Sequence, residues 1–191
     1  DSWDATLEEP LDGRAYAYES SLKIYDANGN SHVLRAYFDP VDDVDGSSGN
    51  RAWEYLVTVP AAEDASALEA KKGILMAGTL TFTPAGELLN MSAFSGTSDD
   101  KGSWTPVPLS QDGFPQLTLT LADAAPITTS LDFGLSTSSG WNLPDGVASM
   151  ADLGTSLAGL PGMISADRGV LALTNFASGS TTIFQNQNGY Q

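Results

Sequence analysis

Three polar residues near the N-terminus have the spacing of a calcium-binding loop. Asp26, Asn28 and Asn30 match its D-x-N-x-N opening, in which alternate oxygen atoms surround a hard cation. The rest of the loop is missing, because Ser31 stands where the template needs glycine and Tyr37 where it needs a bidentate glutamate. The run also contains an Asn-Gly pair, which is typical of a tight hairpin turn. We therefore interpret it as a turn.

A second acidic run precedes Gly46 and contains four aspartates: Asp39, Asp42, Asp43 and Asp45. Neighbouring carboxylates relieve their mutual repulsion when they bind a cation, so calcium is again a candidate ligand. The run fails the EF-hand template, because a loop with Asp43, Asp45 and Gly46 at positions three, five and six would start at Val41 and end at Ala52. We predict a solvated acidic loop over residues 39–50.

Hydrolytic chemistry has weak support. The run Gly154-Thr155-Ser156-Leu157-Ala158 approaches the G-x-S-x-G nucleophile elbow but ends in alanine. His32 is the one histidine of the chain and would have to act as the base, although it lies beside the predicted hairpin turn. We predict no catalytic triad.

Adjacent acidic pairs are the other candidates for hydrolysis, in this case of glycosides. Glu8 and Glu9 form one pair, and Asp99 and Asp100 form another. Neighbours on a strand point to opposite faces, so neither pair has the geometry that a glycosidase needs. Carboxylates from distant strands could still converge, which leaves a glycosidase as an alternative.

The chain contains four tryptophans, whose flat rings could stack on sugars: Trp3, Trp53, Trp104 and Trp141. Trp53 lies in an alternating segment and is predicted to be in the core. Trp104 and Trp141 lie in turn-rich segments and are the better candidates for sugar binding. These tryptophans make a secreted carbohydrate-binding or adhesin β-module an alternative to the function that the family resemblance implies below.

The composition of the chain excludes further classes of protein and of binding site. The chain has 191 residues and no cysteine, which excludes disulfides, thiolate zinc sites, iron–sulfur clusters and cysteine nucleophiles. Its net charge of −16 would repel phosphate backbones and anionic lipids, and no apolar run is long enough to cross a bilayer. We expect no nucleic-acid partner, no membrane partner, no metal and no cofactor.

Short alternating segments separated by turn residues predict an all-β fold, an antiparallel barrel or sandwich with one or two short helices. A hairpin is expected over residues 20–38. Further strands are expected at 53–59, 79–82, 88–94, 116–121, 128–135, 170–176 and 181–185. Short helices are expected at 61–72 and 147–160, and loops at 39–50 and 136–145.

Four segments in order resemble the central domain of the bacterial flagellar hook protein. They are the hairpin at 20–38, the strand at 53–59, the strand and turn at 78–88, and the run Asn186-Gln187-Asn188-Gly189-Tyr190. The residues that carry this family signature are Asp26, Asn28, Gly29, Asn30, Gly86, Asn188, Gly189 and Tyr190. Rod proteins share parts of the pattern, but the large β-domain is more similar to the hook.

The resemblance also bears on domain organisation. The family's terminal helices have no counterpart here, so residues 1–191 resemble the outer β-domain region of a longer hook-type protein. Residues 39–50 and 140–169 are longer than in the family. This extra length corresponds either to surface elaborations or to a small inserted subdomain within about residues 95–179.

The resemblance implies a function. The protein would be a non-catalytic structural subunit of the flagellar hook, the curved tube that transmits motor torque to the filament. It would leave the cell unfolded through the type III export apparatus and act outside the cell. Its partners would be other hook subunits in a helical lattice, together with hook-associated and rod proteins.

Overall fold

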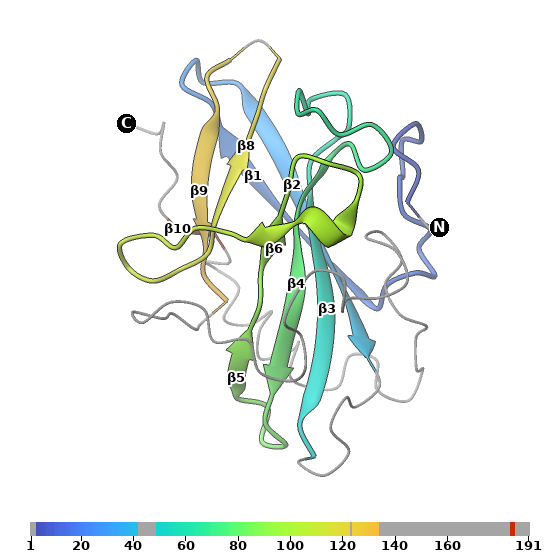
Figure 1. Cartoon of the computed structure of the whole chain (residues 1–191), viewed down its shortest axis with the longest axis vertical. Helices are drawn as coiled ribbons and strands as arrows, with labels where there is room; N and C mark the ends of the chain where they lie inside the picture. Colours follow the sequence, from blue (N-terminus) through green and yellow to red (C-terminus); the bar gives the residue numbers. More distant parts are fainter. Residues whose placement is uncertain (1–2, 42–48, 123, 134–183, 186–191) are drawn as a thin grey trace.

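The computed structural model describes residues 3–41, 49–122, 124–133 and 184–185, and it confirms an all-β architecture. The larger sheet has the strand order β1-β2-β3-β4-β6-β7, and β5 also pairs with β4 (Figure 1). Its strands are β1 (Tyr18–Tyr25), β2 (Ser31–Val41), β3 (Arg51–Thr58), β4 (Ile74–Phe82), β5 (Leu88–Met91), β6 (Phe94–Ser95) and β7 (Thr105–Pro106). All its pairings are antiparallel.

A smaller antiparallel sheet has the order β10-β9-β8. Its strands are β8 (Gln116–Leu119), β9 (Ile127–Leu131) and β10 (Phe184–Gln185). Leu117 and Leu119 are buried while Thr118 and Thr120 are exposed, as the alternation predicts. Leu117 and Leu119 join the same hydrophobic core as the inward residues of the larger sheet, so the two sheets form a sandwich.

The first hairpin forms as predicted. The register of β1 on β2 runs from Tyr18 opposite Phe38 to Tyr25 opposite Ser31. Gly29 has a φ of 86°, which glycine adopts without the steric cost that a side chain would add. The Asn-Gly pair therefore fixes the register of β1 on β2.

The central strands β3 and β4 are buried on both faces. Trp53, Tyr55 and Val57 face the core shared with the smaller sheet, as the alternation predicts. Leu56 faces a second core on the opposite side, which is covered by the N-terminal segment and by the loops after β3 and β6. This second core contains Trp3, Leu11, Tyr37, Leu56, Leu68, Ile74, Ala77, Phe94 and Trp104.

The predicted strand at 88–94 is interrupted. It divides into β5 and β6 because the backbone at Ser92 folds closely over Gly78, where a Cβ atom would collide with the Ser92 carbonyl oxygen. That carbonyl accepts a hydrogen bond of 2.8 Å from the buried Tyr55 hydroxyl. The preceding strand is longer than predicted, since β4 begins at Ile74 rather than at residue 79.

The helix predicted at 61–72 is wrong. These residues form turns, together with a bridge between Asp64 and Leu121. Alanine, glutamate and lysine favour a helix by propensity, but the Asp64 carboxylate accepts the backbone N–H groups of Ser66 and Gly73 at 2.9 and 2.7 Å. Tertiary contacts therefore override local preference. The helical segment that the described residues do contain is a short 3-10 turn, Lys101–Ser103.

The start of the predicted acidic loop is also wrong. Asp39 lies inside β2 opposite Glu54 and is fully buried. Aspartate and proline usually break strands, yet Pro40 continues the pairing with β3 opposite Trp53. Residues 42–48 of that loop lie outside the described part of the chain.

Other predictions fall partly or wholly outside the described residues. The strand predicted at 128–135 is observed as the shorter β9, which begins at Ile127 and ends at Leu131. Of the strand predicted at 181–185, the described part is β10. The predicted loop at 136–145, helix at 147–160 and strand at 170–176 lie outside the described residues.

Candidate functional site

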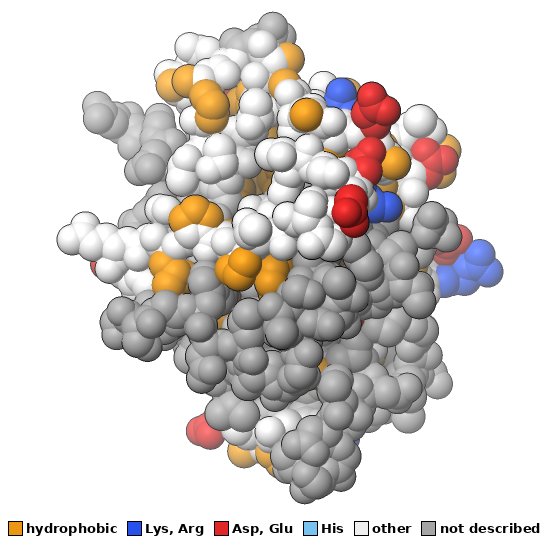
Figure 2. All heavy atoms as spheres, viewed as in Figure 1, with side chains coloured by type: hydrophobic (Ala, Val, Ile, Leu, Met, Phe, Trp, Pro, Cys, Tyr) orange, Lys and Arg blue, Asp and Glu red, His pale blue; other side chains and the backbone are white. Residues whose placement is uncertain are grey.

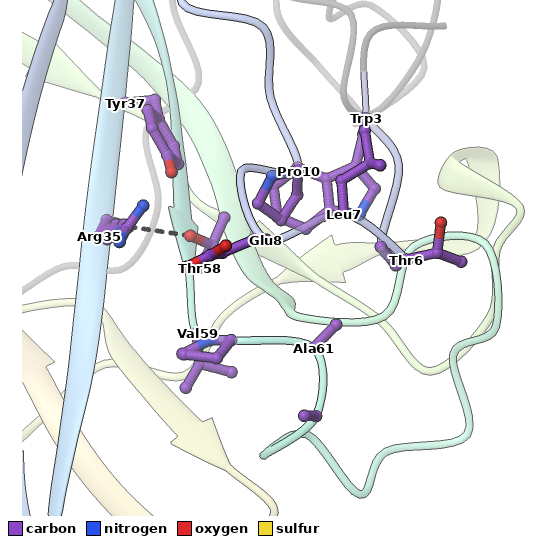
Figure 3. Close-up of a pocket in the computed structure, with 13 residues that line it drawn as sticks. Trp3, Thr6, Leu7, Glu8, Pro10, Arg35, Tyr37, Thr58, Val59 and Ala61 are labelled. Atoms are coloured by element: carbon purple, nitrogen blue, oxygen red, sulfur yellow. Dashed lines mark hydrogen bonds between the residues drawn. The ribbon is translucent and has the colours of Figure 1, made fainter.

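A groove of about 380 Å³ lies between the N-terminal segment and the end of β3 (Figure 3). Trp3, Leu7 and Pro10 form one bank, and Val59 and Ala61 lie across from them. The other lining residues are Ala5, Thr6, Glu8, Arg35, Tyr37, Thr58, Pro60 and Ala62. The groove is thus mainly apolar with a few polar groups on its walls.

Local hydrogen bonds shape the N-terminal bank. Trp3 bridges to Leu11, and the Asp4 backbone N–H donates to the Pro10 carbonyl at 2.8 Å. The Asp4 carboxylate accepts the backbone N–H and the hydroxyl of Thr6, which lowers the pKa of Asp4. These contacts fold the segment into a loop that leaves Leu7 57% exposed at the rim.

Arg35 is the cation of the groove. Its guanidinium lies 3.2 Å from Glu9 and 3.8 Å from Glu19, and its backbone carbonyl accepts the Thr58 hydroxyl at 3.4 Å. Its pKa is raised, first by hydrogen bonding to Tyr37, whose own pKa is raised mainly by burial. Arg35 therefore stays charged and links the N-terminal segment to the sheet.

A second cavity, of about 290 Å³, lies at the tip of the first hairpin. His32 Nδ1 lies 2.6 Å from the Glu63 carboxylate, and Nε2 lies 3.7 Å from the Asp26 carboxylate. The loop between β8 and β9 also lines this cavity, through Leu121, Ala122 and Ala124. His32 therefore joins the hairpin to the loop that follows β3, and no sequence pattern predicts its contact with Glu63.

The turn that carries the predicted signature is organised around Asp26. Its carboxylate accepts the backbone N–H groups of Asn28 and Asn30, both at 2.8 Å, and the Asn30 side-chain amide at 2.9 Å. Burial raises the pKa of Asp26, but these hydrogen bonds outweigh it and the pKa is lowered overall. The Asp26 carboxylate thus closes the turn by accepting hydrogen bonds from residues of the same turn.

Two further aspartates hold the loop after β3 in place; Asp64 had no predicted role, and Asp99 was a candidate only as part of an acidic pair. Asp64 is buried and holds Ser66 and Gly73, as described above. Asp99 accepts three consecutive backbone N–H groups, those of residues 69, 70 and 71. The aspartate-x-serine spacing at Asp64 is a recognisable Asx-turn signal, whereas the partners of Asp99 lie 28 to 30 residues away.

The Asp26 carboxylate of the first calcium candidate is taken up by hydrogen bonds within its own turn, and Asp42, Asp43 and Asp45 of the second lie outside the described residues. Within residues 3–41, 49–122, 124–133 and 184–185, no group of three or more histidine or acidic side chains could hold a metal ion. Glu9 pairs with Arg35, while the Asp100 carboxylate accepts the Gly102 backbone N–H. Ser156 of the approximate nucleophile elbow lies outside the described residues.

Trp104, one of the two candidates for stacking on sugars, is buried and does not offer its ring to a ligand. It is 3% exposed and packs in the second core, and its Nε1 donates a hydrogen bond of 2.7 Å to the Ser98 carbonyl. Trp53 is buried as predicted. Trp141 lies outside the described residues.

Of the remaining signature residues, Gly86 lies in the described part of the chain and the other three do not. Gly86 has a φ of 83° in the turn between β4 and β5, where its backbone N–H donates to the Thr83 carbonyl. Asn188, Gly189 and Tyr190 lie outside the described residues.

No helix among the described residues is long and apolar enough to span a membrane. On the face shown in Figure 2, exposed hydrophobic side chains are scattered among polar ones, and charged side chains gather at one edge.

These features define an antiparallel β-sandwich whose buried carboxylates brace its turns and loops. The chain belongs to the family described as the flagellar basal body protein FlaE D2 domain, whose model matches residues 2–190. The family has a structural role in the flagellar hook and is not an enzyme family, which confirms the resemblance and places the protein in the hook. Neither the curated proteins nor the solved structures contain a match.

Proposed function

We propose that this chain forms an outer structural region of a hook subunit and helps the hook transmit motor torque to the filament, without catalysis. The observation that carries the proposal is the family match over residues 2–190. The fold supports it, because the central strands are buried on both faces and three aspartates tie turns and loops together. Such bracing suits a load-bearing module.

The partners in this proposal are further copies of the chain in a helical lattice, with hook-associated and rod proteins beyond it. Subunits would be exported unfolded through the type III apparatus and would assemble outside the cell. Among the described residues, the large hydrophobic side chains that are exposed are Leu7 and Tyr25. We therefore expect polar, hydrated contacts between outer domains, which would let neighbours slide as the tube bends.

We also propose that residues 1–191 form one outer β-domain region. Leu117, Leu119 and Leu131 share a core with β2, β3 and β4, so this part of the 95–179 segment belongs to the main sandwich. A small inserted subdomain within about residues 95–179, or surface elaborations in its place, would then involve the later part of that segment, which lies outside the described residues. The signature residues Asp26, Asn28, Gly29, Asn30 and Gly86 serve to set the two hairpin turns.

Motility of the source bacterium tests the mechanical role. We would introduce Asp64→Ala, which removes a buried brace, and Glu69→Ala, which removes an exposed side chain of the same loop. Rotation of tethered cells should slow or stop with Asp64→Ala and remain normal with Glu69→Ala. Normal rotation in cells that lack the chain altogether would contradict the proposal.

A further inference from the structure

The turn between β1 and β2 combines a reactive sequence with an open geometry. Asn28 is exposed, and among the described residues no partner holds its side-chain amide. The next residue, Gly29, is also exposed, and a Cβ placed on it would meet no atom within 4 Å. The Gly29 nitrogen, which has no side chain beside it, can therefore approach the Asn28 side-chain carbonyl carbon.

We propose that Asn28 is a site of spontaneous covalent modification, namely deamidation through a cyclic imide. The Gly29 backbone nitrogen loses its proton and bonds to Asn28 Cγ, the bond from Cγ to the amide nitrogen breaks, and ammonia leaves. Water then opens the five-membered ring at either carbonyl and yields aspartate or isoaspartate at position 28. Water is the only co-reactant, no electrons are transferred, and no assembly partner is needed, so the chemistry is independent of a role in the hook.

Asn30 provides a contrast within the same turn. Its side-chain amide donates to the Asp26 carboxylate at 2.9 Å, and its backbone N–H donates to the same carboxylate at 2.8 Å. The residue that follows it is Ser31, which already pairs with Tyr25 in the sheet. The amide of Asn30 is therefore fixed, and its neighbouring nitrogen lies beside a side chain, so the modification should be selective for Asn28.

The native turn also limits the rate. The Gly29 N–H donates to the Asp26 carbonyl at 3.0 Å, and the Asn28 N–H donates to the Asp26 carboxylate at 2.8 Å. Ring closure requires the first of these bonds to open. Asp26 therefore protects Asn28, and the rate of deamidation reports how often the turn opens.

Modification would change the tip of the hairpin permanently. A new carboxylate would stand two residues from the buried Asp26 carboxylate, beside the cavity that His32 and Glu63 line. Isoaspartate would also lengthen the backbone by one carbon inside a turn closed by the Asp26–Asn30 hydrogen bonds. The product should loosen the hairpin tip and its contact with the loop after β3.

Peptide mass spectrometry of the aged 191-residue chain tests the proposal. The folded chain is held in mildly alkaline buffer and then digested with trypsin, which releases residues 24–35 after Lys23 and Arg35. Fragmentation of this peptide should locate the conversion at Asn28 and leave Asn30 intact. Asp26→Ala should accelerate the conversion on the order of tenfold, because it removes the charged acceptor that holds the turn closed.

Two controls separate the reaction from general instability. Asn28→Gln keeps the amide but would need a larger ring, so its peptide should stay unmodified under the same conditions. The urea-unfolded chain gives the rate of the sequence without the turn. An unmodified Asn28 in the folded chain after the unfolded chain has converted, or conversion of Asn30 as fast as Asn28, would overturn the proposal.

Discussion

Replacement of Asp64 by alanine removes the carboxylate that closes the loop between β3 and β4. Asp64 is 2% exposed and accepts three hydrogen bonds: two from Ser66, both at 2.9 Å, and one from the Gly73 N–H, at 2.7 Å. Gly73 is buried with a φ of 90°, and a Cβ there would come within 2.7 Å of the Val59 carbonyl oxygen. A side chain at position 73 would therefore be strained, so the backbone there cannot easily rearrange around a different residue.

The cost follows from those contacts. A hydrogen bond to a charged group contributes about 1.5–3 kcal/mol, and leaving a buried N–H unpaired costs about 1–3 kcal/mol. Because Ser66 is only half-buried and can turn to water, we expect Asp64→Ala to lower the free energy of unfolding by about 3–5 kcal/mol. Asp64→Asn keeps one carbonyl oxygen and should cost about 1–2 kcal/mol.

Urea unfolding followed by tryptophan fluorescence measures the loss, and hydrogen exchange at the Gly73 amide locates it. The matched control is Glu69→Ala, in the same loop but exposed, which should stay within about 0.5 kcal/mol of the parent chain. The reasoning is refuted if Asp64→Ala costs no more than Glu69→Ala, or if the Gly73 amide exchanges no faster in the variant.

Three other predictions concern the sheet, the N-terminal segment and the sugar hypothesis. Gly78→Ala should destabilise the chain by at least about 3 kcal/mol, since its Cβ would collide with the Ser92 carbonyl; an unchanged urea midpoint would contradict this close approach. The side-chain hydrogen bond from Arg14 lowers the pKa of Asp12 to about 2, so its contribution is full above about pH 4, the unfolded value, and is lost as the pH falls towards 2. Asp12→Asn should flatten that part of the stability profile measured by denaturation at each pH, and an unchanged profile would count against it. Trp104→Phe should cost about 1 kcal/mol through loss of the hydrogen bond to the Ser98 carbonyl and change no signal on a glycan array, whereas loss of a glycan signal would restore the carbohydrate-binding alternative.

The parts of the fold that the sequence predicts well depend on local rules. The Asn28-Gly29 turn and the alternation on either side of it predict the register of β1 and β2. Alternation at Leu117 and Leu119 likewise identifies β8 and its inner face. In each case a short pattern and a suitable turn residue agree, so tertiary contacts add to the local preference.

The errors occur where distant contacts decide the outcome. The helical composition of residues 61–72 yields to the carboxylates of Asp64 and Asp99, one of which lies about 30 residues away in sequence. Asp39 and Pro40 resemble loop residues but are held in β2 by their pairing with β3. Trp104 lies in a turn-rich segment, yet its ring is covered by the second core.

The candidate sites were harder to predict than the fold. The Asp26 turn could be recognised, because all its hydrogen bonds fall within four residues. The pairing of His32 with Glu63 spans 31 residues, and the groove is formed by segments that meet only after folding. Patterns in a single sequence carry no information about such long-range contacts.

Immunogold electron microscopy of the source bacterium, with antibody raised against this chain, tests the central claim most directly. Label confined to the short curved segment between the cell envelope and the filament is the predicted result. It would support a structural hook subunit over a carbohydrate-binding module on the general cell surface. Label spread over the cell surface, or absent from every flagellum, would contradict the assignment.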